Sequence, residues 1–275
     1  MEIARADTGL GTAFERLSLN RYFASLLKRH SISSVLEGPT DGIKGIMGIN
    51  SMELSRLGAH VTLILESQPH LDYASSVWKK YGCEGTFICQ EQMNLDVPPQ
   101  SFDMVWNFSA LPQIENYEAT IDAMVKASRK YVLVFVSNTR NYGFRLHRLH
   151  HEREKEPWHH GNIDIMDVGK IGGLLRARGL EVVEEIFADV PWWPDIDKPV
   201  GELISTFLPF LKAFVKDTAH ARRFNFDIEN LPYYDPSRQK DMDELYRRHG
   251  VFERSGIKPL QHFFAHHRGV LAQKS

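Results

Sequence analysis

The sequence predicts an α/β protein with a largely parallel sheet and helices on both faces. Five short apolar segments alternate with helical segments before residue 138, which is the pattern of consecutive strand–helix–strand units. The fifth of them, residues 131–136 (YVLVFV), has an apolar run without interruption, as expected for a strand buried on both faces of a parallel sheet. Residues 33–66 show one such unit in most detail.

The composition is that of an ordinary globular protein. The 275 residues are 43% hydrophobic and 25% charged. A net charge of −2 disfavours nucleic acid as the main partner. The two cysteines, Cys83 and Cys89, are too few for a disulfide framework and fit a reducing compartment. Because there is neither an apolar signal-peptide core nor a run of ~20 apolar residues, we expect a cytoplasmic protein without a membrane segment.

Residues 33–66 predict a βαβ unit. A first strand closes at Val35-Leu36, a second covers residues 61–65, and Gly58 ends the helix between them. Three apolar residues suggest the buried face of that helix: Met52, Leu54 and Leu57. Because the crossover is right-handed, the glycine turn and Glu66 should share one sheet edge, where ligands bind in such sheets. Taken alone, residues 33–66 fit a nucleotide-binding turn and a plain packing unit equally well.

The other elements are assigned in chain order from apolar periodicity and turn residues. An amphipathic helix covers residues 13–30, with Phe14, Leu17, Tyr22 and Leu26 at near-helical spacing. Later helices are expected at 70–82, 122–130 and 167–179, and strands at 85–89, 102–106, 131–136, 180–187 and 260–274. Two stretches interrupt this alternation: residues 138–162, rich in basic, aromatic and histidine residues, and the aromatic-rich insertion 191–257.

The strand ends carry a family resemblance. Residues 35–42 (VLEGPTDG) resemble the first motif of the class I S-adenosylmethionine-dependent methyltransferases, a glycine loop that holds the methionine part of the cofactor. The family pattern has three glycines at alternate positions. Here Glu37 directly precedes Gly38, Thr40 stands at the place of the middle glycine, and Gly42 supplies the last.

Three further motifs follow in the family's order. Residues 61–66 (VTLILE) resemble the second motif and imply that Glu66 accepts hydrogen bonds from the ribose hydroxyls, a task that suits a carboxylate. Counting back from Ser101-Phe102-Asp103 places Glu91 and Gln92 beside the adenine. Strand four ends at residues 106–111 (WNFSAL), which the family brings under the methyl-bearing end of the cofactor.

The resemblance implies the full fold and the cofactor site. It implies a Rossmann-like, seven-stranded mixed sheet whose antiparallel last strand lies next to the sixth, plus a mainly helical insertion before that last strand. The expected parts are an N-terminal helical segment (1–30), a cofactor-binding domain (31–190 and 258–275) and a helical lid (191–257). The implied cofactor-binding residues are Glu37, Gly38, Pro39, Thr40, Asp41, Gly42, Glu66, Ser67, Glu91, Gln92, Asn107 and Phe108.

Methyl transfer needs few catalytic side chains, because the sulfonium is already a good leaving group. A general base is needed only if the acceptor must lose a proton. The candidates lie in residues 138–162, after strand five: His159, His160 and Tyr142, with His150 and His151 beside them. Loop packing or anion binding is the ordinary alternative for these histidines. We expect no metal, because adjacent histidines point apart and no acid has a recognised spacing.

The C-terminal histidines and the aromatic residues near the insertion have less specific roles. His262, His266 and His267 alternate with strand residues and are assigned a structural role. Five aromatic residues could line an acceptor pocket or simply pack the insertion: Trp158, Trp192, Trp193, Tyr233 and Tyr234.

The sequence thus favours an S-adenosylmethionine-dependent methyltransferase with a small-molecule acceptor. The size of the insertion suggests an enclosed site, and its apolar parts could also serve a homodimer. Two alternatives remain: a nicotinamide-dependent oxidoreductase, although the Gly-x-Gly-x-x-Gly fingerprint is absent after strand one, and a catalytically silent module that binds the cofactor. The acceptor atom is not predicted, since this fold accepts several kinds.

Overall fold

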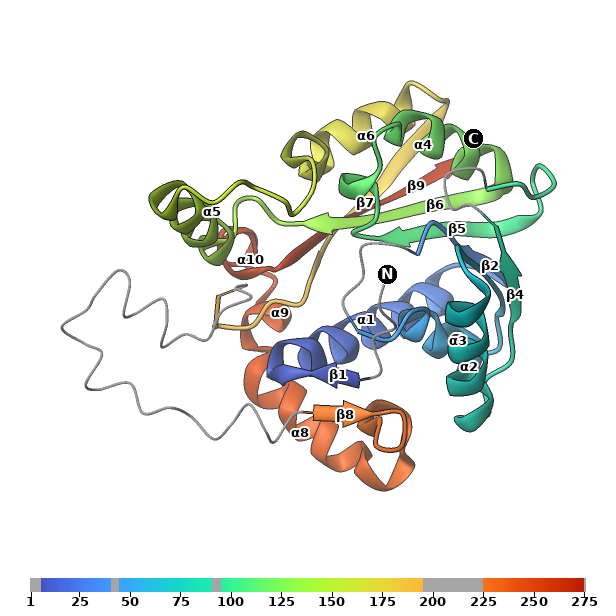
Figure 1. Ribbon diagram of the computed structural model, residues 1–275, viewed down its shortest axis with the longest axis horizontal. Helices are drawn as coiled ribbons and strands as arrows, with labels where there is room; N and C mark the ends of the chain where they lie inside the picture. The colour runs from blue at the N-terminus through green and yellow to red at the C-terminus, as the bar shows by residue number, and fades with distance from the viewer. Residues whose placement is uncertain (1–5, 41–44, 91–94, 195–224, 275) are drawn as a thin grey trace.

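The computed structural model describes residues 6–40, 45–90, 95–194 and 225–274 and has the predicted α/β architecture. Seven strands form one sheet in the order β4-β3-β2-β5-β6-β9-β7 (Figure 1). Their bounds are β2 (Ser34–Glu37), β3 (His60–Leu65), β4 (Thr86–Cys89), β5 (Phe102–Phe108), β6 (Ser128–Ser137), β7 (Leu180–Ala188) and β9 (His267–Lys274). The pairs among β2 to β6 are parallel, and β9 runs antiparallel between β6 and β7. The mixed sheet and the place of its last strand are therefore confirmed.

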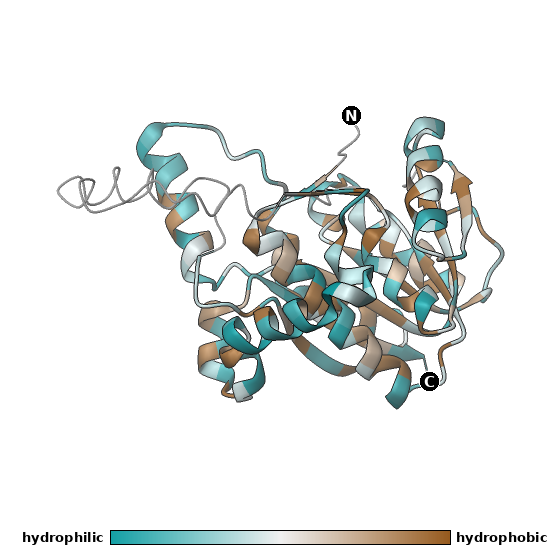
Figure 2. Ribbon diagram, turned by 90° about the horizontal axis from the view of Figure 1, so that it is seen from below, coloured by the Kyte–Doolittle hydropathy of each residue, from teal (hydrophilic) through white to brown (hydrophobic). Residues whose placement is uncertain are grey.

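Helices cover both faces of this sheet, as predicted. One face packs against α1 (Gly9–Arg29), α2 (Met52–Arg56) and α3 (Gln68–Lys80), the other against α4 (Tyr117–Ala127) and α6 (Val168–Arg176). Successive strand residues alternate between the two cores: Val35 belongs to the α1 side and Leu36 to the α4 side. In Figure 2 the apolar residues gather along the strands and the inward faces of these helices. No helix within the described ranges is long and apolar enough to cross a membrane.

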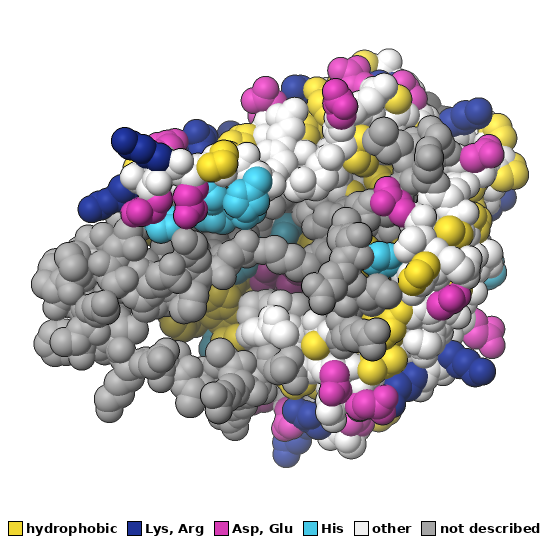
Figure 3. All heavy atoms as spheres, viewed as in Figure 1, with side chains coloured by type: hydrophobic (Ala, Val, Ile, Leu, Met, Phe, Trp, Pro, Cys, Tyr) yellow, Lys and Arg dark blue, Asp and Glu magenta, His cyan; other side chains and the backbone are white. Residues whose placement is uncertain are grey.

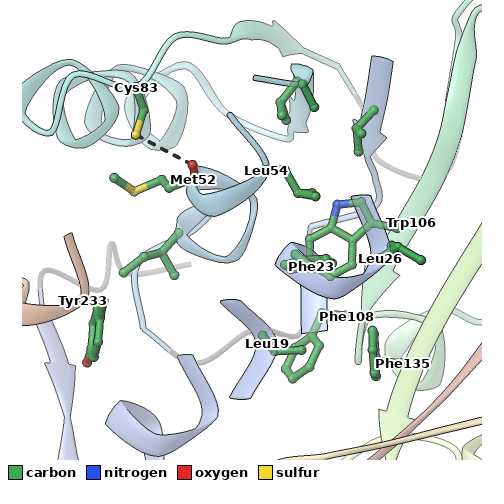
Figure 4. Packing of buried hydrophobic residues seen from close by; sticks show 14 of the residues in the cluster. Leu19, Phe23, Leu26, Met52, Leu54, Cys83, Trp106, Phe108, Phe135 and Tyr233 are labelled. Atoms are coloured by element: carbon green, nitrogen blue, oxygen red, sulfur yellow. Dashed lines mark hydrogen bonds between the residues drawn. The ribbon is translucent and has the colours of Figure 1, made fainter. Parts of the chain in front are cut away.

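The core on the α1 side is rich in aromatic rings. Phe23 of α1 meets Trp106 of β5 edge to face, with ring centroids 4.9 Å apart, and both side chains are buried (Figure 4). The indole Nε1 of Trp106 donates a 3.0 Å hydrogen bond to the Ser51 hydroxyl, so its one polar atom is satisfied. Burial of each such side chain contributes roughly 1.5–3 kcal/mol, which fixes α1 across the sheet.

The amino edge of the sheet carries a purely structural acid. Asp103 at the start of β5 accepts hydrogen bonds from the backbone N–H and the hydroxyl of Ser33, at 2.9 and 2.7 Å. Burial works to raise the pKa of Asp103, but these hydrogen bonds and the nearby Lys130 ammonium hold it at about 2. The Ser-Phe-Asp signal of the sequence therefore marks the joint between β2 and β5, on the edge opposite to the strand carboxyl ends.

The N-terminal segment and the insertion pack on each other. β1 (Ala6–Thr8) pairs antiparallel with β8 (Asn225–Asp227) to form a second, two-stranded sheet. α8 (Gln239–His249) lies along α1, where the Phe14 and Tyr246 rings stack with centroids 5.7 Å apart. The insertion ends with α9 (Val251–Ser255), so its described part after residue 227 is mainly helical, with the 3-10 turns η7 (Pro232–Tyr234) and η8 (Pro236–Arg238).

Two local predictions are wrong, and one helix was not predicted. Residues 258–264 form a helix, α10 (Lys258–Phe264), with a proline in its first turn, so the last strand starts only at His267. Residues 142–154 form another helix, α5 (Tyr142–Glu154), begun by the side chain of Asn141, which accepts from the backbone N–H groups of two following residues. Leu57 is 41% exposed because the α2 helix already ends at Arg56.

Candidate functional site

The strand order creates a crevice between β2 and β5. β2 is followed by α2 on one face and connects outward to β3, whereas β5 is followed by α4 on the other face and connects to β6. The two strands are neighbours, with Glu37 opposite Trp106. Connections that leave adjacent strand ends toward opposite faces form the topological switch point at which open α/β sheets bind ligands.

Two buried polar side chains flank this crevice without a partner. Glu37 and Asn107 are both fully buried. Within the described residues neither carboxylate oxygen of Glu37 and neither amide atom of Asn107 has a hydrogen-bond partner. Alternation along the strands assigns Glu37 to the α1 face and Asn107 to the α4 face. Because an unsatisfied buried polar group costs about 1–3 kcal/mol, two of them at one crevice point to a ligand that satisfies them.

The environment of Glu37 changes its acidity. Burial raises the pKa of Glu37 to about 7, while the Ser51 hydroxyl and the Arg16 guanidinium oppose a larger rise. Near neutral pH this carboxyl is therefore half protonated. A cationic group placed against it would favour the ionised form.

The loop after β2 is held close to the sheet. The Gly38 N–H donates to the Trp106 carbonyl at 3.0 Å, and the Thr40 hydroxyl donates to the Ile64 carbonyl at 2.8 Å. A Cβ atom at Gly38 would lie 2.9 Å from Cδ2 of Leu95, so glycine permits this close approach. Thr40 at the place of the middle glycine thus ties the loop to β3.

The chain after this loop is anchored by buried hydrogen bonds from outside the unit. The Trp78 indole N–H of α3 donates to the Gly48 carbonyl at 3.2 Å, and the Tyr234 hydroxyl of the insertion donates to the Ile49 carbonyl at 2.8 Å. Both contacts fix η1 (Ile49–Ser51), the turn that leads into α2. The insertion therefore supports the segment next to the candidate ligand loop.

The other residues implied by the resemblance are placed in part. Glu66 follows β3 at the same sheet edge and is exposed, and Ser67 caps the N-terminus of α3. Phe108 ends β5 and is buried. Four of the implied residues lie outside the described ranges: Asp41, Gly42, Glu91 and Gln92.

A histidine that the sequence analysis had assigned to structure lies at this edge. His267 begins β9 and pairs with Ser137 and Ala188, the last residues of β6 and β7. Its ring lies against Phe108, with centroids 4.6 Å apart. His267 Nδ1 lies 3.8 Å from Oε2 of Glu15 and 3.9 Å from Oδ2 of Asp189.

These groups belong to a largely buried row of charges that begins on α1 with Arg16 and Glu15. The Arg16 guanidinium donates to Oδ2 of Asp7 at 3.0 Å and to Oε1 of Glu15 at 2.6 Å, and Glu15 faces His267. The row continues from His267 to Asp189, whose Oδ2 lies 2.8 Å from Nδ1 of His266. Burial raises the pKa of Glu15, although the Arg16 and His267 charges oppose the rise. The row runs from Arg16, whose charge acts on Glu37, to His267, whose ring lies against Phe108.

Two edge residues have strained backbones. Ser109, directly after β5, has φ of 56°, and Asp189, directly after β7, has φ of 55°. Non-glycine residues seldom adopt this left-handed conformation, and strained residues cluster at functional sites. Each also has a buried side-chain oxygen without a partner within the described residues, Oγ of Ser109 and Oδ1 of Asp189.

The residues predicted as catalytic lie on or after α5. The Tyr142 hydroxyl donates to the Trp192 carbonyl at 2.8 Å, and burial raises the pKa of Tyr142 to about 12, so this hydroxyl stays protonated at neutral pH. His159 is exposed, with Nδ1 3.2 Å from the Pro157 carbonyl, and His160 lies beside His151. Their catalytic role stays a prediction. Glu15 and Asp189 lie in no motif of the sequence that marks them as site residues.

The fold is that of the class I S-adenosylmethionine-dependent methyltransferases. Magnesium protoporphyrin IX methyltransferase from Synechocystis PCC 6803, solved with bound S-adenosylhomocysteine, is similar over 96% of this chain and 85% of its own, with a TM-score of 0.55 and 12% identity. A candidate methyltransferase in complex with a Haloferax volcanii methyltransferase activator is similar over 94% of this chain and 89% of its own, with a TM-score of 0.52 and 13% identity. A candidate sarcosine dimethylglycine methyltransferase from Galdieria sulphuraria is similar over 93% of this chain and 85% of its own, with a TM-score of 0.50 and 11% identity. No protein-family model matches the sequence, and no curated protein matches it significantly.

Proposed function

We propose that this protein is an S-adenosylmethionine-dependent methyltransferase that acts on a small-molecule acceptor. The observation that carries the proposal is the pair of unpartnered, fully buried polar side chains, Glu37 and Asn107, at the switch point of a methyltransferase-type sheet. The similar protein from Synechocystis, solved with the demethylated cofactor, supports the same ligand class here.

The residues at the crevice fit the cofactor chemically. The Glu37 carboxyl suits the ammonium group of the methionine part, because a cation there would favour ionisation of an acid whose pKa is about 7. The Asn107 amide offers both a donor and an acceptor. Exposed Glu66, at the end of β3, suits the vicinal ribose hydroxyls. The adenine contacts remain assigned by resemblance to Glu91 and Gln92.

The cofactor, when bound, supplies a methyl group on a sulfonium, which is a good leaving group. The chain then has to hold the acceptor in line with that methyl group, exclude water and take any proton that the acceptor loses. His267 is the best-placed base: it lies against Phe108, and its Nδ1 side faces the Glu15 and Asp189 carboxylates. Carboxylates on the Nδ1 side favour a proton there, which leaves Nε2 as the basic atom.

The N-terminal segment and the insertion together form the cover that we propose encloses the acceptor. The β1–β8 pairing and the α1–α8 packing join them outside the main sheet. Such enclosure favours a small acceptor over a macromolecule and excludes water from the reacting atoms.

Isothermal titration with S-adenosylmethionine and S-adenosylhomocysteine tests the proposal. We expect binding of both by the unmodified protein, and binding weakened by roughly 1.5–3 kcal/mol in Glu37→Gln, since a charge-assisted hydrogen bond is lost. Glu181→Gln is the matched control, because Glu181 is an exposed residue at the start of β7, on the opposite edge. No binding of either compound at sub-millimolar concentration would falsify the proposal.

Two further measurements separate the alternatives. A fluorescence change on addition of NADH, together with no binding of S-adenosylmethionine, would favour an oxidoreductase. Binding of the methyl donor without transfer of a labelled methyl group to any component of a cell extract would favour a catalytically silent module.

A further inference from the structure

A second group of histidines lies on α5, outside the row of charges described above. His147 and His151 are one turn apart on this helix, and His160 returns to them from the loop that follows it. His151 Nε2 lies 3.2 Å from His147 Nε2 and 3.2 Å from His160 Nε2. Figure 3 shows histidine side chains gathered on the surface over α5, at the end of the molecule to which the parallel strands point.

Hydrogen bonding alone accounts poorly for these distances. An imidazole nitrogen carries either one proton or one in-plane lone pair, so His151 Nε2 can make one well-aligned hydrogen bond and not two. A bound cation, by contrast, uses the lone pair of each nitrogen. Two nitrogens that bind one tetrahedral Zn²⁺ at about 2.0–2.1 Å lie roughly 3.3–3.4 Å apart, close to the separation observed.

The scaffold around the three rings is well defined. Trp158 packs edge to face on His151 and His160, with centroids 5.4 and 4.8 Å away, and its indole N–H donates to the Gly161 carbonyl at 2.9 Å. Gly161 has φ of 94°, and a Cβ there would lie 2.7 Å from the Pro112 carbonyl oxygen, so glycine is needed where the loop turns beside His160. Pro112 belongs to η3 (Leu111–Gln113), which follows β5.

The groups around these three histidines also suit a bound cation. His151 is buried, and its Nδ1 faces Oε2 of Glu156 at 3.9 Å. A carboxylate behind a metal-binding histidine is the usual arrangement, because it fixes the ring and raises the basicity of the ligand nitrogen. Imidazole ligands suit Zn²⁺ and other late first-row divalent ions, whereas Mg²⁺ and Ca²⁺ prefer oxygen.

We propose that His147, His151 and His160 bind one divalent transition-metal ion, with Zn²⁺ as the expected occupant. Three protein ligands leave the fourth tetrahedral position for water or for an oxygen, nitrogen or sulfur atom of a bound molecule, as in catalytic rather than closed structural zinc sites. The proposed site departs from the expectation that the histidines bind no metal. That expectation considered only adjacent pairs, whereas the ligands come from i, i+4 spacing on a helix and from the loop after it.

Metal binding by the full, untagged chain tests the proposal directly, without the methyl donor. After treatment with a chelator, the protein is titrated with Zn²⁺ in competition with a chromophoric chelator, and with Co²⁺ followed by visible absorption. We expect one ion per chain and the intense absorption of tetrahedral Co²⁺. Removal of one ligand, in His147→Ala or His151→Ala, should weaken Zn²⁺ binding by more than about 100-fold, since even loss of a supporting carboxylate costs 10–100-fold.

His159→Ala is the matched control, because His159 is an exposed neighbour of His160 that is not part of the triad. It should keep the affinity for Zn²⁺ within about threefold. Thermal unfolding with and without Zn²⁺ checks folding: the metal should raise the melting temperature of the unmodified protein and of His159→Ala, but not of His147→Ala. Absence of binding, a stoichiometry well above one, or equal loss in His159→Ala would overturn the assignment. Because no cofactor is present, failure here leaves the methyltransferase proposal untouched.

Discussion

Arg16 and Asp7 form an ion pair with 3.0 Å between Nε and Oδ2, and both side chains are fully buried. The pair joins α1 to β1, and Arg16 also donates to Oδ1 of Asn50 at 2.7 Å, in the turn before α2. Burial works to lower the pKa of Arg16, but the Asp7 and Glu15 carboxylates raise it, so the guanidinium stays charged. The contacts that hold the segment next to the candidate ligand loop therefore depend on an ion pair without access to water.

Replacing one partner of this pair should destabilise the protein strongly. Asp7→Ala leaves the Arg16 charge buried with fewer acceptors, and breaking a buried pair costs about 3–5 kcal/mol. Urea unfolding measures the loss. Arg247→Ala is the control, because it removes an ion pair with Glu244 that is exposed at the surface, and it should leave the midpoint unchanged. Equal midpoints for Asp7→Ala and the unmodified protein would contradict this assignment.

Glu37 should make the stability of the ligand-free protein fall as the pH rises. Its pKa is raised by burial from 4.5 to about 7 in the folded state, so between these values the folded protein retains a proton that the unfolded chain has lost. Stability conferred by that proton is complete below pH 4.5 and is lost as the pH approaches 7, with a total of about 3 kcal/mol.

The Glu37→Gln variant isolates this effect. The glutamine does not titrate, so the difference in unfolding free energy between variant and unmodified protein should grow from pH 4.5 to 7 and then level off. Urea titrations at four or five pH values suffice. A constant difference over this range would show that Glu37 is not desolvated in solution.

His267 should affect methyl transfer without affecting cofactor binding. If the His267 ring takes the acceptor proton, His267→Gln should lower transfer by roughly 10²–10⁴-fold for an acceptor that must be deprotonated. Transfer of label from methyl-labelled cofactor to extract components gives the activity, and calorimetry gives the affinity. Loss of both together would indicate a structural role for His267 in the buried row of charges.

Two glycines should respond in opposite directions to alanine. Gly161→Ala forces a side chain into a left-handed backbone and against the Pro112 carbonyl, which should cost about 1–3 kcal/mol. Gly173 lies in the α6 helix with open space around it, so Gly173→Ala should stabilise the protein by about 0.5–1 kcal/mol. We therefore expect the denaturation midpoint of Gly161→Ala to lie below that of the unmodified protein and the midpoint of Gly173→Ala to lie above it. Shifts of both midpoints in the same direction would contradict this prediction.

The sheet was predictable because its strands carry a strong local signal. The apolar run at residues 131–136 and the glycine stop at Gly58 reflect the neighbouring residues alone, and both agree with the structure. The strand order followed from the family resemblance. The Ser-Phe-Asp segment predicts the places of Glu91 and Gln92, which lie outside the described ranges, and only the structure reveals that its Asp103 joins β2 to β5.

The roles of the histidines were harder to predict, because they depend on the residue at which a helix or strand begins. Starting the last strand at residue 260 placed His267 in the middle of the sheet, whereas helix α10 moves the strand start to His267 and puts it at the site edge. His147 and His151 are neighbours only once residues 142–154 are helical. Glu15 and Asp189 are 174 positions apart in the chain, so only the tertiary fold brings them to the same ring.

The pairing of β1 with β8 has a practical consequence for labelling. In a chain whose exposed Cys89 is replaced by serine, a fluorophore on a cysteine introduced at Thr8 would sit on the strand that joins the two parts of the proposed cover, and should report their separation when ligands enter or leave. A fluorophore at Gln273, near the start of β7 on the far edge of the sheet, would keep a fixed position as the reference. Energy transfer between these two positions would test in real time whether the proposed cover opens when a ligand binds.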